Sequence, residues 1–144
     1  MNRRRAIVAL VLAAVWPMTA GAEAPGRRPP GEYPADRDPR LTALARSAEP
    51  IIAAIERFRA ANRHFPSIAE AAALDIERVN GRNVGNFAAL GDWLYYSESD
   101  GSGYVLSRKL GWDARLLYQR EGTAKRWLYD PGDGSEQKEI VLEP

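Results

Sequence analysis

The residues of this chain that could do chemistry are one histidine and two groups in its C-terminal part, acids and aromatics. His64 is the single histidine and the chain has no cysteine, which disfavours Ser-His-Asp, Cys-His and multi-histidine zinc chemistry. A histidine directly before Phe65 and Pro66 is typical of a surface loop, and acid–base catalysis would need a shaped network of partners around it. The sequence therefore predicts no catalytic residue and a non-enzymatic protein.

Acids alternate with glycines in two stretches that could hold calcium. One contains Asp130, Asp133 and Glu136, and the other runs from Glu98 to Ser102. Calcium takes several oxygen ligands from a flexible loop, but neither stretch has the twelve-residue EF-hand pattern. Aspartate and glycine are also what tight turns require for backbone reasons. A weak calcium site at the first stretch is one prediction, turns without metal are the other, and no further cofactor is expected.

Tryptophan and tyrosine are dense between residues 93 and 129. About half of these rings are needed as core under a helix, because a mixed domain of this size must bury large apolar groups. Trp112, Trp127 and Tyr129 are the candidates for exposure, with the side of the strand that carries Leu128 as the alternative to Trp127 and Tyr129. Exposed rings on a sheet can stack on sugars or hold a peptide. They form the candidate ligand-binding set.

An amphipathic helix from Leu41 to Phe65 must position these groups. Its apolar residues recur at intervals of three and four, which places them on one stripe. Asp38 is a suitable N-cap, with a proline at the first helical position. Pro50 lies inside the pattern, so the sequence allows either a kinked helix or two helices that meet there, with Ser47 capping the second.

A second element follows the proline that stops this helix. Ser67 and Glu70 form a capping box, which predicts a short helix through about Leu74. Turn residues occupy 80–86, and from Gly91 the apolar period changes from 3.6 to 2. Strands are expected at 93–96, 104–110, 114–118, 125–129 and 140–142. Helices followed by a four- to five-stranded antiparallel meander define an α+β fold.

The junction Asn62–Ser67, at the end of a long amphipathic helix, resembles the helix-to-loop junction in headgroups of type IV pilins and type II secretion pseudopilins. Trp93–Tyr96 and Tyr104–Leu106 are similar to the aromatic strands of that family, and the resemblance spans residues 41–129. It implies a sheet packed across the helix and a binding or scaffolding role beside a secretion or pilus apparatus. The calcium-loop motif of the major pseudopilins has no residue-by-residue match here.

The N-terminus departs from that family. Arg3–Arg5, the apolar run Ala6–Trp16 and small residues up to Ala22 have the layout of a secretory signal peptide cut after Ala22. The run is shorter than the roughly 20 residues of a membrane-spanning helix, and it lacks the glutamate of filament-forming pilins. We therefore expect a signal peptide at 1–22, a Pro/Gly-rich flexible leader at 23–40 and one pilin-like domain at 41–144.

Charge adds little to this prediction. Removing the signal peptide takes three arginines from the 20 basic residues, which leaves 17 against 19 acidic ones, a net charge of about −2. This disfavours a nucleic-acid partner. The sequence predicts a periplasmic or secreted scaffolding protein that binds an envelope or secretion-system protein. The alternatives are a carbohydrate- or peptide-binding domain and, third, a small secreted hydrolase.

Overall fold

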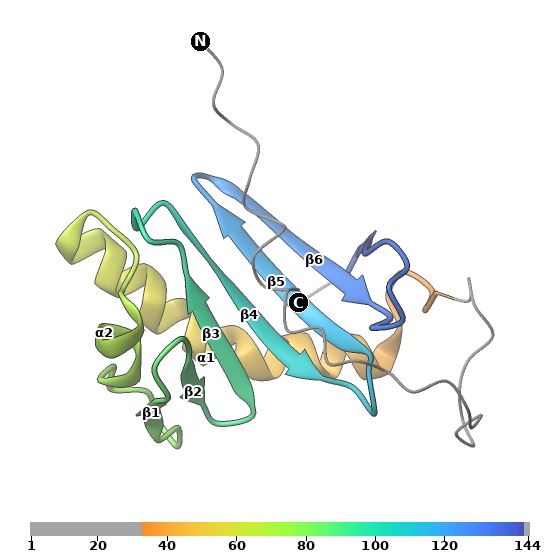
Figure 1. Ribbon diagram of the computed structural model, residues 1–144, viewed down its shortest axis with the longest axis horizontal. Helices are drawn as coiled ribbons and strands as arrows, with labels where there is room; N and C mark the ends of the chain where they lie inside the picture. The colour runs from red at the N-terminus through yellow and green to blue at the C-terminus, as the bar shows by residue number, and fades with distance from the viewer. Residues whose placement is uncertain (1–32, 143–144) are drawn as a thin grey trace, which may run out of the picture. The chain divides into compact units, whose positions relative to one another are not determined.

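The computed structural model describes residues 33–142, so the predicted signal peptide and most of the predicted leader lie outside the described residues. In the described part, helices α1 (Pro39–Asn62) and α2 (Ile68–Ala72) precede seven strands. The strands are β1 (Gly81–Asn83), β2 (Ala88–Leu90), β3 (Trp93–Ser97), β4 (Gly103–Lys109), β5 (Arg115–Glu121), β6 (Ala124–Asp130) and β7 (Lys138–Ile140). They pair antiparallel in chain order, and α1 crosses one face of the sheet (Figure 1).

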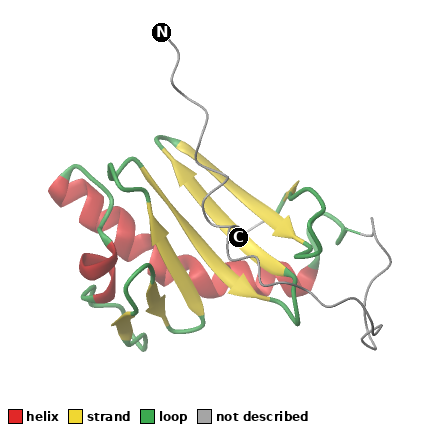
Figure 2. Cartoon of the chain, viewed as in Figure 1, coloured by secondary structure: helices red, strands yellow, loops and turns green. Residues whose placement is uncertain are grey.

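The α+β class and the antiparallel meander are confirmed, but the expected number of strands was too low. Figure 2 shows the additional short strands β1 and β2 beside the long ones. Each has three residues, and β2 is Ala88-Ala89-Leu90, so neither has the β-branched composition that signals a strand. The strands β1 and β2 join the sheet because β2 pairs with β3. Their strand conformation thus depends on tertiary contacts and not on local composition.

Helix α1 is one continuous helix through Pro50. Asp38 caps it as predicted, since its Oδ1 accepts a hydrogen bond of 2.9 Å from the amide of Arg40. Pro50 and Arg46 lie on the exposed side, where water can reach the carbonyl that the proline leaves without a donor. The helix ends at Asn62, three residues before the expected end, because Arg63 takes the left-handed conformation with φ 66°.

The buried face of α1 packs against one face of the sheet. The helix contributes Leu41, Ala45, Ala48, Ile51, Ala54 and Ile55. The sheet contributes Trp93, Tyr95, Tyr104, Leu106, Leu116, Tyr118, Tyr129 and Ile140. Small alanines on the helix leave room for large rings on the strands, and the two sets bury each other.

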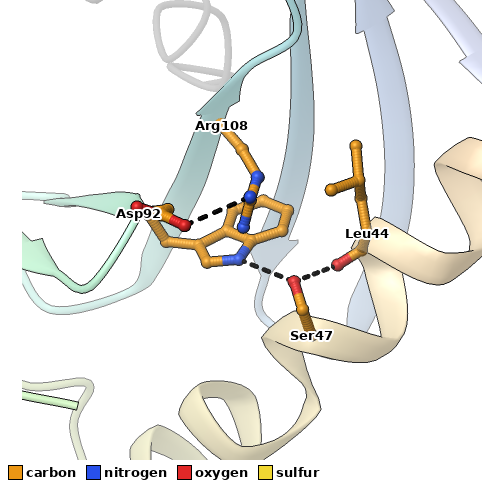
Figure 3. Close-up of polar contacts among 5 residues, drawn as sticks. Leu44, Ser47, Asp92 and Arg108 are labelled. Atoms are coloured by element: carbon orange, nitrogen blue, oxygen red, sulfur yellow. Dashed lines mark hydrogen bonds and ion pairs between the residues drawn. The ribbon is translucent and has the colours of Figure 1, made fainter.

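Ser47 links α1 to β3 instead of capping a second helix. Its hydroxyl donates to the carbonyl of Leu44 at 2.6 Å and accepts the indole N–H of Trp93 at 3.2 Å (Figure 3). The guanidinium carbon of Arg108 lies over that indole, 5.8 Å from the ring centroid, and Asp92 forms an ion pair with the same arginine at 3.2 Å. The buried tryptophan thus has a partner for its only polar group.

The junction between the helices is also tied to the sheet. Phe65 and Pro66 are buried, and the hydroxyl of Tyr95 donates to the carbonyl of Pro66 at 2.5 Å. The predicted capping box is present, with both hydrogen bonds between Ser67 and Glu70. Helix α2 nevertheless ends at Ala72, earlier than expected.

Two stacked tyrosines on the core face should respond in opposite ways to loss of their hydroxyls. Tyr95 and Tyr104 have ring centroids 5.4 Å apart, but the buried hydroxyl of Tyr104 has no hydrogen-bond partner among residues 33–142. We expect Tyr104→Phe to raise the free energy of unfolding by about 1 kcal/mol, because it removes an unpaired buried polar group. Tyr95→Phe, the matched control, should lower it by about 1 kcal/mol. Urea unfolding of both variants measures this, and a destabilised Tyr104→Phe would contradict it.

Candidate functional site

The structure places the three predicted ligand-binding aromatics in different environments. Trp112 lies in the turn between β4 and β5 and is 86% exposed. Trp127 faces α1, with its ring centroid 4.9 Å from that of Tyr118 and 6.0 Å from that of Trp93. Tyr129 is buried on the same face. The three rings therefore do not form one exposed platform, and Trp112 alone offers its ring to a ligand.

The turn that presents Trp112 is well supported. The amide of Leu110 donates to the carbonyl of Ala114 at 2.8 Å, which closes the turn. Gly132, in the loop between β6 and β7, lies so close to the backbone of Asp113 that a side chain there would collide with it. That glycine also has φ 75°, a conformation that favours glycine. The turn and the acidic loop therefore pack against each other, which brings Trp112 close to the predicted calcium stretch.

In that acidic loop, the carboxylates mainly stabilise turns. The buried Asp130 accepts the amide of Gly132 at 2.9 Å through Oδ1 and the side-chain amide of Gln137 at 3.1 Å through Oδ2. Asp133 accepts the amide of Ser135 at 3.0 Å. Within residues 33–142, no group of three or more His, Cys, Asp or Glu side chains could hold a metal. The calcium site at Asp130, Asp133 and Glu136 stays a prediction.

The second acidic stretch gathers like charges. Glu98 lies beside Asp100 in the β3–β4 turn, and Glu121 comes from the end of β5. Burial, with the negative charges of Asp100 and Glu121, raises the pKa of Glu98. Hydrogen bonds from Ser102 lower the pKa of Asp100, which is the chemistry of a turn. In the native protein, the carboxylates of Asp100 and Glu121 therefore repel that of Glu98.

His64 belongs to the helix–sheet junction. Its Nδ1 lies 2.9 Å from the carbonyl oxygen of Phe65, and its ring meets that of Phe58 edge-on at 5.5 Å. Gly101 packs against its Cβ. These contacts hold the histidine at the start of the turn into α2.

One partly buried ion pair was not predicted from the sequence. The spacing of Glu56 and Arg59 predicts a pair on α1, but Glu56 instead accepts the Nε of Arg120 from β5 at 2.8 Å. Arg120 is buried, and its hydrogen bond to Glu56 raises its pKa. The guanidinium carbons of Arg59 and Arg120 lie 4.6 and 5.5 Å from the ring centroid of Phe65. This cluster fixes α1 on the sheet, and no local spacing could have indicated a partner 64 residues away.

The face of the sheet opposite α1 is apolar in part, and the buried Ser107 and Gln119 also lie on it. The pairing register places Leu94, Leu117 and Leu128 in one row across it. The half-buried rings of Phe87 and Tyr96, with centroids 5.7 Å apart, lie toward the β2 side. The alternation of apolar and polar residues predicted one apolar face for each strand, so the row of leucines on the opposite face was not predicted. Its signal was a pair of adjacent apolar residues in β5 and again in β6, because neighbours in a strand face opposite sides.

No protein-family model, no curated protein and no solved structure matches this chain. Among residues 33–142, none of the helices has both the length and the apolar character to cross a membrane.

The burial of Glu98, together with charge repulsion, leads to a pH-dependent prediction. A raised native-state pKa means that the ionised carboxylate opposes folding, and that stability is gained as the pH falls through that pKa. Glu98→Gln should therefore raise the midpoint of thermal unfolding at pH 7. The gain should shrink toward pH 4, and high salt should remove only the part that comes from repulsion, because salt does not restore the hydration that the carboxylate loses on burial.

Differential scanning fluorimetry across this pH range measures the effect. Glu139→Gln, at an exposed glutamate of β7 outside the cluster, is the matched control and should change the midpoint little. A lower midpoint for Glu98→Gln at pH 7 would show that the repulsion is not significant.

Proposed function

We propose that this chain is a non-enzymatic binding or scaffolding protein of the periplasm or the cell exterior, built like a pilin or pseudopilin headgroup and acting beside a secretion or pilus apparatus. The observation that carries the proposal is the packing of α1 across one face of an antiparallel meander. The chain passes from helix to sheet through the buried Phe65 and Pro66, held by Tyr95. This is the arrangement that the resemblance to the headgroups implies.

The polar side chains of the described part support a role in binding. Each buried charge serves the fold: Arg120 pairs with Glu56, and Asp130 bonds a turn amide and Gln137. The one histidine contacts its neighbours at the junction. Catalysis needs converging polar groups in a cleft. In residues 33–142 the buried polar contacts are used for structure instead.

Export and partnership can be tested together in the organism that encodes the chain. We expect the full-length chain with a C-terminal tag to appear outside the cytoplasm with Glu23 as its first residue. In vivo cross-linking should then join it to a pilin, a pseudopilin or another component of that apparatus. Deleting the apparatus genes should reduce the cross-linked product at least tenfold.

A signal-peptide variant is the matched control. Replacing Arg3, Arg4 and Arg5 with glutamate removes the basic n-region, so this variant should stay in the cytoplasm and lose the cross-link. A wild-type chain that keeps its N-terminus in the cytoplasm would contradict the location. An exported chain whose cross-links do not change when the apparatus is deleted would contradict the scaffolding role.

The exposure of Trp112 favours a second candidate function, a carbohydrate- or peptide-binding domain. A tryptophan 86% exposed on a closed turn offers a flat apolar ring at little cost in ordering. Lys109 and Arg115 form the cross-strand pair at the base of that turn. They could supply polar contacts to a ligand stacked on the ring.

For this second function, we expect Trp112→Ala to weaken binding of an envelope glycan or peptide at least tenfold without changing the midpoint of thermal unfolding. Isothermal titration and tryptophan fluorescence measure the binding. Val84→Ala, at another exposed apolar residue, is the matched control and should leave affinity unchanged. Equal affinities of the wild type and Trp112→Ala would exclude the turn as the binding site.

A further inference from the structure

Residues 33–37, which we name the arm, bind the C-terminal part of the sheet although the sequence assigned them to a flexible leader. The ring of Tyr33 meets Tyr129 edge-on, with centroids 6.0 Å apart and planes at 83°. Its hydroxyl donates to the carbonyl of Glu136 at 2.9 Å. The ammonium of Lys138 lies 5.5 Å from the ring centroid. The compact unit accordingly begins at Tyr33, before the predicted boundary at Leu41.

The second half of the arm pairs with the backbone that follows β7. The amide of Arg37 donates to the carbonyl of Val141 at 2.8 Å, and the amide of Val141 donates to Oδ1 of Asp36 at 3.0 Å. Pro34, between the two sets of contacts, is buried. The arm thus satisfies the backbone of a segment that would otherwise be an open edge of the sheet.

These contacts define a peptide-binding site that the chain fills with its own residues. The site consists of Tyr129, Lys138 and the backbone of Glu136 and Val141. It recognises an aromatic ring with a hydroxyl, a following proline and a carboxylate three residues after the ring. Backbone pairing with side-chain contacts on either side is a known mode of peptide recognition. The arm that fills the site precedes α1 in the chain. The core of the sheet therefore does not depend on the covalent connection between the arm and α1.

The connection between arm and helix has a strained residue. Arg37 has φ 61°, in the left-handed region that costs a non-glycine residue free energy. It lies immediately before the N-cap Asp38. An arm released from its own site can relax at this position, which offsets part of the cost of opening.

From these observations we propose that a second copy of the chain can occupy the site with its arm, so that two copies exchange arms. The arm of one chain already fits the site of the same chain. Exchange would form the same contacts between two chains. Five extended residues span about 17 Å, so the two α1 starts must lie close together. An attached arm competes at an effective concentration of about 1 mM, so exchange requires concentrations of that order. This inference is independent of the proposed function.

Mixing of two mass-labelled forms tests the exchange. Residues 23–144, with and without nitrogen-15, are held at about 1 mM, warmed below the unfolding midpoint and cooled. Native mass spectrometry should then detect mixed dimers. A peptide of residues 31–38 should compete with the arm and reduce the dimer fraction. A chain that stays monomeric at 1 mM would overturn the proposal.

Variants separate the arm from other interfaces. A chain that begins at Asp38 lacks the arm and should form no dimer, whereas Asp36→Ala, at an exposed residue, loses the same contact in the monomer and in the dimer and should change the dimer fraction little. Trp112→Ala removes an exposed ring outside the arm and should leave the dimer unchanged. Circular dichroism of each variant confirms that it is folded. A dimer that persists in the chain that begins at Asp38 would show that the copies associate through another surface, which would also overturn the proposal.

Discussion

The buried stripe of α1 depends on the ring-rich face of the sheet. Ala45, Ala48 and Ala54 are small, so they bury little apolar area themselves and leave space that only large side chains from the strands can fill. Trp93, Tyr95 and Tyr104 fill it, and each brings a polar atom into the core. A helix of this kind would have no stable partner without the meander, and the meander would expose its rings to water without the helix.

The polar atoms of those rings determine where the helix lies. Ser47 accepts the indole of Trp93, and the carbonyl of Pro66 accepts the hydroxyl of Tyr95. The pair of Glu56 with Arg120 makes a third tie between these two points. Because buried donors and charges are costly when unpaired, a shift of α1 along the sheet would break all three ties together. They therefore specify one register of the helix on the strands.

Because these ties fix α1 on the sheet, the turns and the chain ends are the parts that remain to contact a partner. The β4–β5 turn is supported from beneath by Gly132 and holds Trp112 in solvent. At the end of the sheet, Tyr33 covers Tyr129, and Asp36 and Arg37 form hydrogen bonds with Val141 beyond β7. Rigid presentation of an exposed ring and a peptide bound at a sheet edge are both properties of recognition domains.

Local signals in the sequence determined much of this architecture. The cap at Asp38, the capping box from Ser67 and the change of period after Gly91 each depend on residues within one turn or strand, so they could be predicted and were confirmed. Tertiary structure alone decided the pairing of Glu56 with Arg120, the recruitment of β1 and β2 and the orientation of Trp127. These features depend on partners distant along the chain. Local periodicity shows which residues should be buried, but only the assembled sheet determines which side chains meet.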